Sequence, residues 1–446
     1  MIPNSDKTVH IFNQNSSSVW SVLHDVIDSY LQEEPFFVFD IGELVNSFNV
    51  WKQLFPRVEP FYAVKCNDSP IVLEILSLLG TGFDCASKGE IKKIMSLGVE
   101  PEKLIFANPA KLSSHIQYAA SVQVSKMTFD NESELYKIKK FYPNSDLVIR
   151  IRSDDENALC QLGIKFGCDP VTEAPHLLKL AQKLDLNVIG VSFHVGSDCR
   201  NPQAFRKALL ACKSIFSIAK RFGFELKFLD IGGGFPGGKT ALITEIAKIV
   251  NKTLEEEFAD ESLQIIAEPG RYFVTSAYTL ACQIYSKKEL GSNESRMNRN
   301  HIMYYINDGV YGSFNCILFD HRKITPIIFD QKYHCHSNLV DSSIWGPTCD
   351  GLDRVVDHIL MPQLKVGDWL IFENMGAYTL TSSSEFNGFP APKILTIVND
   401  SVWDFLNNLL KFDKNRFVVE NGLNFKLDVD SGHSSDDNNI LVEETF

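Results

Sequence analysis

The stretch PFYAVKCND, Pro60–Asp68, carries the strongest structural signal in this sequence. The residues FYAV have the composition of a short buried strand, and the run ends abruptly at the amine of Lys65. Turn-forming and helix-starting residues follow in Cys66–Pro70. A lysine held at the tip of a buried strand can form a Schiff base with a carbonyl cofactor, whereas a lone lysine at a strand end is usually an ordinary surface residue. The other strands of the chain decide between these two interpretations.

Short apolar runs of this kind alternate with helical patterns from about residue 41 to residue 270. Strand–helix alternation favours a parallel sheet with right-handed crossovers, and eight such units match a closed (β/α)8 barrel. The alternative is an open doubly wound sheet, but its usual fingerprint, GxGxxG after the first strand, is absent from the sequence. The predicted strands are Phe61–Lys65, Gly82–Ser87, Leu104–Pro109, Lys126–Asp130, Asp146–Ile151, Val188–Gly196, Leu226–Gly233 and Gln264–Gly270.

The pattern changes after Arg271 to short strands without long helices, which predicts a β-domain over residues 271–420. The N-terminal segment, residues 1–40, ends in another predicted strand, Phe36–Asp40, and is expected to join this domain. The fold class is therefore an α/β barrel, residues 41–270, followed by a β-domain. The predicted strands after the barrel are Tyr272–Lys287, Met303–Asp308, Cys316–Phe319, Thr325–Phe329, Asp368–Glu373 and Lys393–Val398.

Composition narrows the class of protein. A net charge of −13 argues against nonspecific nucleic-acid binding, and no apolar run approaches the ~20 residues that span a bilayer. The ten cysteines form no CxxC pair, which is typical of free thiols in a reducing compartment, so we expect a cytoplasmic protein. His334 and His336 flank Cys335 without a further partner at ligand spacing, so no metal site is predicted. The final residues, 421–446, are acidic and are expected to be disordered.

Polar side chains gather at the carboxyl ends of the predicted barrel strands. In a parallel barrel this rim is the catalytic face, and a purely structural barrel has no reason to place so many polar groups there. The rim residues are Lys65, Asp84, Asn108, Asp130, Arg150, His194, Gly232–Gly234 and Glu268.

These rim residues suit a phosphorylated, ring-shaped aldehyde. The run Gly232–Gly234 lets backbone N–H groups approach an oxyanion closely, although an isolated run of glycines is usually only a flexible turn. Arg271 can bind a phosphate as a charged fork, and Ser197 can donate its hydroxyl to it. Glu268 can hold a protonated ring nitrogen and His194 can stack on a flat ring; alone, each has a structural explanation, as a surface ion pair or a buried histidine. Together with the lysine, they predict pyridoxal 5′-phosphate, which is an electron sink for a carbanion.

Long motifs make the sequence similar to the eukaryotic ornithine decarboxylases, of the alanine-racemase-like fold group of pyridoxal-phosphate decarboxylases. The resemblance extends over about residues 8–420. It rests on PFYAVKCND (60–68), GFDCASKGEI (82–91), SFHVGS (192–197), LDIGGGFPG (229–237), AEPGRY (267–272), WGPTCDGLD (345–353) and FENMGAYT (372–379).

The resemblance implies decarboxylation of L-ornithine to putrescine and CO₂, the first step of polyamine synthesis. It implies that Lys65, His194 and Cys349 are catalytic, with Cys349 protonating the carbanion once CO₂ has left. Asp320 and Asp350 would receive the distal ammonium of the substrate. The implied cofactor-binding residues are Lys65, Asp84, Arg150, His194, Ser197, Gly234, Glu268, Gly270, Arg271 and Tyr378.

The resemblance also implies a homodimer with shared active sites, in which Cys349 and Asp350 reach the pocket from the other subunit. From the residues alone, Cys349 would be interpreted as an inert buried cysteine. Phe319 stands where vertebrate relatives carry Tyr, a difference near the distal amine that we expect to affect chain-length preference without removing activity.

Other functions stay open at the level of sequence. One is a catalytically inactive decoy resembling antizyme inhibitor, which keeps the fold and binds the regulatory protein antizyme. Another is a decarboxylase that prefers lysine, since one methylene is discriminated by only ~1–3 kcal/mol.

Residues 111–141 align with the antizyme-binding region of animal relatives and hold candidate contacts for an acidic partner, although a solvated helix face is the plain alternative. These candidates are Lys111, Lys126, Lys137, Lys139 and Lys140.

Overall fold

The computed structural model describes residues 8–13, 18–29, 33–153, 162–291, 301–329, 339–409 and 413–422. Two predictions, the disordered tail beyond residue 422 and the lack of a metal site at His334–His336, fall outside these ranges.

Eight parallel strands close into a barrel, which confirms the predicted (β/α)8 architecture and excludes the open sheet. The strands are β3 (Glu59–Ala63), β4 (Gly82–Cys85), β5 (Leu104–Phe106), β6 (Lys126–Phe129), β7 (Asp146–Arg150), β8 (Asn187–Ser192), β9 (Phe228–Asp230) and β10 (Gln264–Ala267). Their spatial order follows the chain, and β10 closes the ring against β3.

The strands end earlier than their apolar patterns suggested. Lys65 lies in a single 3-10 turn, Val64–Cys66, directly after β3, and Glu268 follows the end of β10. His194 likewise lies in a loop two residues beyond the end of β8. The functional rim is therefore made of loop residues that the strands hold in place, as is common for binding residues on a rigid scaffold.

Large and small residues interlock inside the barrel. Phe61 and Phe228 belong to an interior cluster with Ile105, Val148 and Ile266. The neighbouring strands β4 and β8 carry glycines opposite these two phenylalanines. A Cβ on Gly82 would lie 2.6 Å from the Phe61 ring, and one on Gly190 would lie 2.3 Å from the carbonyl oxygen of Phe228, so no side chain fits at either position. The barrel is thus a packed core that leaves only its rim for chemistry.

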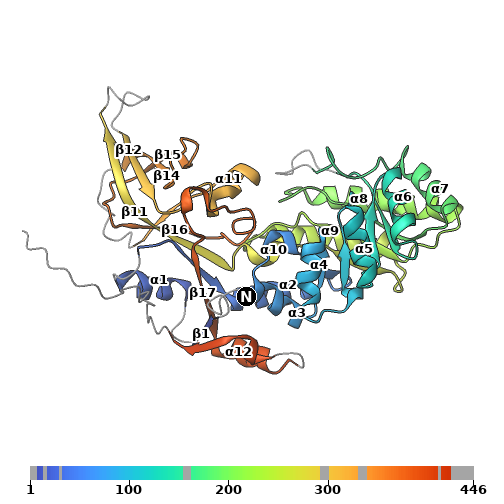
Figure 1. Cartoon of the computed structure of the whole chain (residues 1–446), viewed down its shortest axis with the longest axis horizontal. Helices are drawn as coiled ribbons and strands as arrows, with labels where there is room; N and C mark the ends of the chain where they lie inside the picture. Colours follow the sequence, from blue (N-terminus) through green and yellow to red (C-terminus); the bar gives the residue numbers. More distant parts are fainter. Residues whose placement is uncertain are drawn as a thin grey trace, which may run out of the picture.

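Amphipathic helices cover the barrel (Figure 1). The long helix α8 (Pro202–Arg221) begins with Pro at its first turn, is capped by the side chain of Asn201, and buries residues at helical spacing such as Ala204, Ala208 and Cys212. The others are α2 (Ile41–Leu54), α3 (Pro70–Leu78), α4 (Lys88–Met95), α5 (Ser113–Ser121), α6 (Glu132–Phe141), α7 (Ala174–Lys183) and α9 (Leu242–Glu257).

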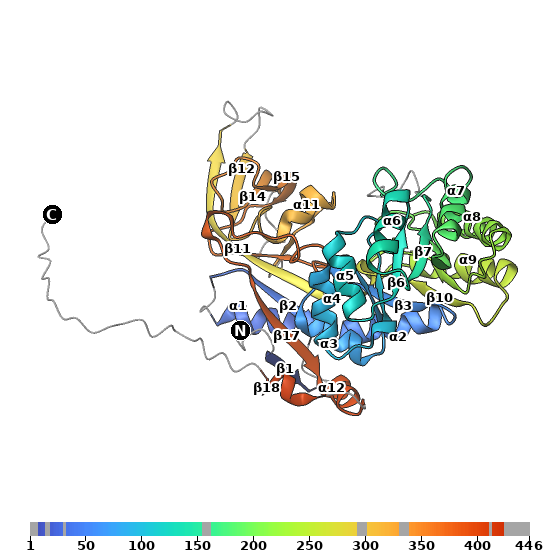
Figure 2. The ribbon, with the colours of Figure 1, turned by 45° about the vertical axis from the view of Figure 1, so that its right-hand side comes forward.

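A separate sheet domain of ten strands packs beside the barrel. Its strands are β1 (Thr8–Phe12), β2 (Phe36–Asp40), β11 (Tyr278–Leu290), β12 (His301–Ile306), β13 (Ile327–Ile328), β14 (Leu339–Trp345), β15 (Arg354–Pro362), β16 (Trp369–Phe372), β17 (Lys393–Asn399) and β18 (Val418–Asn421). N- and C-terminal strands alternate in it, since β17 lies between β2 and β1 (Figure 2). Helices α1 (Val19–Asp28) and α12 (Asp400–Asn407) flank this sheet.

One predicted strand of this domain is wrong and another is wrong at its start. Cys316–Phe319 is the short helix α11, and the start of Tyr272–Lys287 is helical as α10 (Arg271–Val274). Four apolar residues do not distinguish a strand from a buried helical turn, and α11 continues a preceding 3-10 turn, Ser313–Asn315. The exact domain boundaries at residues 40, 270 and 420 stay predictions.

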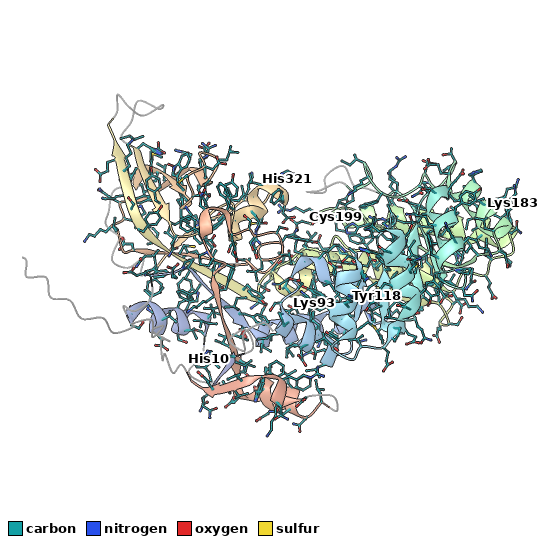
Figure 3. The ribbon with its side chains drawn as sticks, viewed as in Figure 1. His10, Lys93, Tyr118, Lys183, Cys199 and His321 are labelled. Carbon is teal, nitrogen blue, oxygen red and sulfur yellow. The ribbon has the colours of Figure 1, made fainter. Side chains whose placement is uncertain are left out.

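The loops after the barrel strands face the sheet domain. Figure 3 labels Cys199, in the loop after β8, and His321, directly after α11, where the two domains meet. Their chain neighbours Asp198 and Asp320 line one cavity. No helix in the described ranges is long and apolar enough to cross a bilayer.

Candidate active site

A cavity of about 410 Å³ opens at the carboxyl end of the barrel strands, between them and α11. All the predicted cofactor-binding residues except Asp84 line it, together with Asn108 and Asp320. Asp130 is not among the lining residues; its carboxylate instead accepts a hydrogen bond from the backbone N–H of Gly167, 2.8 Å away.

Lys65 and Asp84 form an ion pair at the floor of the cavity. The Asp84 side chain is fully buried on β4, while that of Lys65 is 42% exposed because its amine ends in the cavity. Burial opposes the charge on the amine, but the nearby carboxylates of Asp84 and Glu268 outweigh it and raise the pKa of Lys65. The buried aspartate therefore orients the amine and holds its proton.

Glu268 presents a buried carboxyl without a complete set of partners. Its Oε1 atom has no hydrogen-bond partner within the described residues. Burial, followed by repulsion from Asp230 and Asp84, raises the pKa of Glu268 well above its usual range. Asp230 shares this environment, and burial raises its pKa as well. An orphaned buried acceptor costs free energy unless a ligand supplies a donor, so Glu268 is suited to a protonated nitrogen.

His194 is a neutral, flat group beside the glycine run. Its Nδ1 accepts a hydrogen bond from the backbone N–H of Gly196 at 3.0 Å. Burial, with the positive charges of Arg150 and Lys65, lowers the pKa of His194 well below its usual range. A Cβ on Gly233 would lie 2.7 Å from the Nε2 atom of His194, so only glycine fits beneath the ring.

A guanidinium borders the glycine run on the side of the sheet domain. Arg271 Nη2 donates to both carboxylate oxygens of Asp320, at 2.7 and 2.8 Å, and to Ser197 Oγ at 3.0 Å. The Tyr378 ring covers this guanidinium, with its centroid 5.1 Å from Cζ. Gly234 has φ +99°, and a Cβ there would lie 2.5 Å from the Gly196 carbonyl oxygen, so the backbone closes tightly around this corner.

Comparison with known proteins identifies the family. Residues 41–275 match the family described as pyridoxal-dependent decarboxylase, pyridoxal binding domain. Rat ornithine decarboxylase is 46% identical over 406 residues, which cover 86% of this chain and 87% of that protein. This chain belongs to the pyridoxal-dependent decarboxylases.

Other members of this decarboxylase family differ in activity. Antizyme inhibitor 2 of Xenopus laevis is 46% identical over 392 residues, 86% of each protein. The crystal structure of Paramecium bursaria Chlorella virus arginine decarboxylase bound to agmatine superimposes with a TM-score of 0.80 at 36% identity, covering 85% of this chain and 100% of that one. Lysine/ornithine decarboxylase of Vibrio vulnificus, complexed with cadaverine, gives 0.75 at 28% identity, with 85% and 99% covered.

Two predicted site residues of this decarboxylase-family chain lie outside the cavity. Cys349 is exposed in the loop between β14 and β15, and its backbone N–H donates to Asn387 Oδ1 at 3.0 Å. Asp350 follows it and accepts a hydrogen bond from the Tyr311 hydroxyl. Neither is among the cavity-lining residues of the described chain. Tertiary structure therefore divides the predicted site into a rim group that lines the cavity and a loop group that does not.

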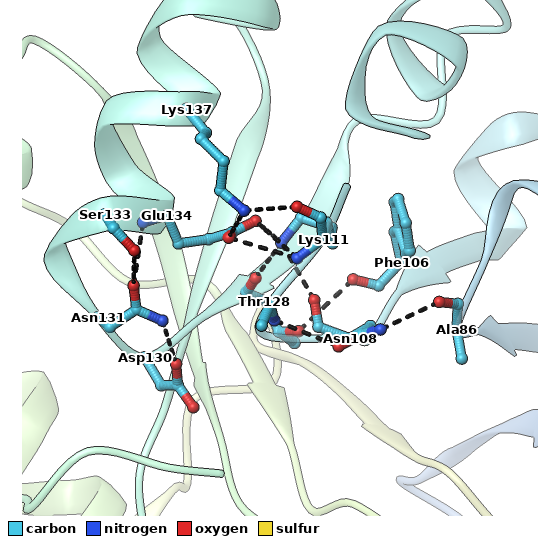
Figure 4. Close-up of polar contacts among 11 residues, drawn as sticks. Ala86, Phe106, Asn108, Lys111, Thr128, Asp130, Asn131, Ser133, Glu134 and Lys137 are labelled. Carbon is cyan, nitrogen blue, oxygen red and sulfur yellow. Dashed lines mark hydrogen bonds and ion pairs between the residues drawn. The ribbon is translucent and has the colours of Figure 1, made fainter. Parts of the chain in front are cut away.

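Lys111 is not available on the surface of this decarboxylase, contrary to the sequence-based expectation. Its amine is buried between the barrel and α6, and Figure 4 shows it donating to the carbonyl oxygens of Thr128, at 2.6 Å, and Asn108, at 3.2 Å. It also pairs with the buried carboxylate of Glu134 at 2.9 Å, which binds Lys137 as well. Burial lowers the pKa of Lys111 to about 8 despite these partners.

Some cavity residues had no sequence signal, among them Leu162 and Phe166, which line the cavity from the segment before α7. Phe319, which the sequence analysis placed near the distal amine, lines it from α11. Apolar residues in loops do not stand out by type, because most such residues pack or lie on the surface. Asp198 directly follows the SFHVGS motif, so its position next to Ser197 was the one available hint.

Proposed function

We propose that this protein is a pyridoxal 5′-phosphate-dependent decarboxylase that converts L-ornithine to putrescine and CO₂, the first step of polyamine synthesis. The observation that carries the proposal is the cavity itself, in which an amine, an orphaned carboxyl and a glycine-lined corner with a guanidinium converge. When bound, the cofactor supplies an aldehyde for the lysine and an electron sink for the charge left on the substrate.

The residues present fit such a cofactor. The Oε1 atom of Glu268 lacks a hydrogen-bond partner among the described residues, which suits a ring N–H. The Gly233–Gly234 corner has no room for a Cβ, which suits close approach of a phosphate to backbone N–H groups. Neutral His194 lies over Gly233, in a position suited to stacking on a ring. Arg271, with Ser197 and Tyr378, would complete the phosphate site.

The chain's own acids and bases then have separate tasks. Lys65 would hold the cofactor and exchange protons with Asp84, its buried partner. Burial raises the pKa of Glu268, so its carboxyl holds a proton before the cofactor binds; it would transfer this proton to the ring nitrogen and then pair with it as a carboxylate. Cys349 would return a proton to the substrate carbon after CO₂ has left. Gly270 and Arg150 would shape the cavity beside these groups.

A homodimer with shared sites accounts for the remote loop. Cys349 is exposed and lies outside the cavity of its own chain, so a second copy is the natural source of the proton donor. Large apolar side chains are exposed near the two groups, since Leu352 in the loop and Phe319 at the end of α11 are each 69% exposed. Exposed apolar area of this kind is typical of an interface between subunits. Asp350 would come with Cys349 and join Asp320 around the distal ammonium.

The substrate is proposed as ornithine because two carboxylates suit a distal ammonium, and because curated relatives over most of the chain, such as the rat protein, are ornithine decarboxylases. A diaminopimelate substrate would bring a distal carboxylate, which Asp320 and Asp350 would repel. Lysine remains the competing substrate, since it differs by one methylene.

A decarboxylation assay tests the proposed activity. Purified protein with added pyridoxal 5′-phosphate should release CO₂ from ornithine faster than from lysine or arginine, and the Lys65→Ala variant should release none. Borohydride reduction followed by mass spectrometry should locate the cofactor on Lys65. A decoy like antizyme inhibitor 2 predicts the opposite result, with no CO₂ from any of the three. The intact set Lys65, Asp84, His194 and Glu268 favours the enzyme.

We also propose antizyme as a regulatory partner, bound through residues 111–141. Lys111 is excluded from this surface by its burial, and Lys137 is partly used by Glu134. Lys140 is exposed on α6 and is the better candidate; its half-buried neighbour Lys139 donates to the Asp185 carbonyl oxygen at 3.2 Å and is the second. The double variant Lys139→Glu/Lys140→Glu should lose antizyme binding in a pull-down while keeping decarboxylase activity, and unchanged binding would refute the surface.

We further propose a reducing, cytoplasmic location. Eight cysteines of the described chain are free thiols, and seven of these are buried. A chain stabilised by its core rather than by disulfides fits such a compartment.

A further inference from the structure

The guanidinium of Arg271 is held by residues from both domains. Arg271 begins helix α10, directly after the barrel, whereas Asp320 ends helix α11 in the sheet domain. Both side chains are almost completely buried, at 9% and 8% exposure. A single nitrogen, Nη2, donates to both oxygens of Asp320 and to the hydroxyl of Ser197. This nitrogen is therefore fully committed to the protein.

The remaining donors of Arg271 are left for a ligand. Its Nε atom is buried and has no hydrogen-bond partner among the described residues. The Tyr378 ring lies over one face of the guanidinium, which restricts its rotation. Arg271 and Gly234 line the same cavity, so the guanidinium and the glycine corner border a common space. A buried donor without a partner in an otherwise anchored guanidinium points to an anion that completes it.

We propose that Asp320 is a positioning residue for the cofactor phosphate, acting through Arg271, in addition to its proposed contact with the substrate ammonium. The inference rests on the proposed function, since it assumes that Arg271 binds the phosphate of pyridoxal 5′-phosphate. Asp320 and Ser197 hold Nη2, and together with the Tyr378 ring they restrict the orientation of the guanidinium beside the glycine corner.

Two effects of the Asp320 carboxylate oppose each other. Its negative charge competes with the phosphate for the same cation, which would weaken cofactor binding. Its two hydrogen bonds hold a long, otherwise flexible side chain in one orientation, which strengthens binding because less order must be created when the phosphate arrives. Nη2 lies 2.7 and 2.8 Å from the two Asp320 oxygens in a short, buried and charge-assisted contact, so we expect orientation to outweigh competition.

Cofactor binding without substrate tests this role separately from catalysis. The dissociation constants of pyridoxal 5′-phosphate and of pyridoxal, which lacks the phosphate, are measured by fluorescence titration of the cofactor-free dimer. Asp320→Ala should raise the constant for pyridoxal 5′-phosphate by roughly tenfold, the usual effect of losing one charge-assisted contact, and leave that for pyridoxal unchanged. Asp320→Asn keeps one acceptor and should have a smaller effect.

A nearby carboxylate provides the matched control. Asp198 lines the same cavity but pairs with Arg200, at 3.3 Å, instead of Arg271. Asp198→Asn removes the same charge without touching the guanidinium, so it should leave both dissociation constants unchanged. In an Arg271→Met background, Asp320→Ala should cause no further loss, because the residue through which it acts is gone.

Specific results would overturn the inference. An unchanged or lower dissociation constant for pyridoxal 5′-phosphate in Asp320→Ala would mean that the carboxylate does not orient the arginine. Equal losses for pyridoxal and its phosphate would indicate general loosening of the cavity. If the unaltered protein bound no pyridoxal 5′-phosphate at all, the proposed function itself would fail instead.

Discussion

The barrel rim and the β14–β15 loop differ in whether their predicted site residues reach the cavity within one chain. At the rim, Lys65, Glu268 and Arg271 follow neighbouring strands of one closed barrel and converge on one cavity. In the loop, Cys349 and Asp350 are held by local contacts to Asn387 and Tyr311 and lie outside that cavity. A single chain can thus form the candidate cofactor site, whereas under the proposed function the proton donor comes from a second copy. Each prediction below tests this division.

The largest effect is expected at the rim. Lys65→Ala should reduce kcat for ornithine by on the order of 10⁴-fold or more, because the residue that binds the cofactor covalently is removed. The measurement is CO₂ release under saturating cofactor. Lys93→Ala is a matched control, since Lys93 is a lysine paired with Asp68 near the same rim but outside the cavity. Comparable activity of the two variants would contradict the assignment of Lys65.

Cys349 in the β14–β15 loop should contribute nearly as much to kcat, by acting in the active site of the other subunit. Cys349→Ala should lower kcat by roughly 10²–10⁴-fold, the range for loss of a general acid. When Cys349→Ala and Lys65→Ala proteins are mixed and exchanged, half of the dimers are mixed and each has one intact site, so about one quarter of the original activity should return. Mixed dimers that remain inactive would place both residues in one chain's site.

A charge introduced on the exposed β14–β15 loop should weaken dimerisation without changing cofactor binding at the rim. Leu352→Asp is expected to weaken dimerisation by about tenfold or more, since it buries a carboxylate in an apolar contact. Sedimentation velocity should show more monomer, and activity should become dependent on protein concentration. Cofactor affinity of the rim should change little. Loss of cofactor binding in parallel would mean that the rim is not complete within one chain.

The smallest effect is expected in the thermal stability of the cofactor-free protein, through Glu268 at the rim. The pKa of Glu268 is raised in the folded protein, so folding favours the protonated form and stability falls as pH rises from the unfolded pKa toward the folded one. Glu268→Gln stays neutral and should lose less stability between pH 5 and pH 8, with a difference in Tm of about 1 °C for each kcal/mol in a chain of 446 residues. Thermal unfolding of both cofactor-free proteins across this range measures it. Parallel pH profiles would mean that Glu268 is not the buried acid described.

The regular alternation of strand and helix patterns made the barrel predictable from the sequence. Part of the sheet domain was not predicted, because its strands contain buried polar residues. Strands β14 and β15 were missed because β14 carries Asp341, Ser342 and Ser343, a sequence typical of a loop. All three are buried, and the ring of His301 on the adjacent strand lies 3.1 Å from Asp341 Oδ2 and 2.8 Å from Ser343 Oγ. Such strands depend on partners that are distant in sequence, so no local pattern reveals them.

The amino-acid sequence by itself determined the eight-stranded barrel and the identity of the polar groups on its rim. These follow from periodicity and residue type, which act over a few neighbouring residues. Only the tertiary structure decided that Arg271 pairs with Asp320, that Lys111 is buried, and that Cys349 lies away from the cavity. Ion pairs and burial depend on which segments meet in space, and the packing of the two domains sets those distances.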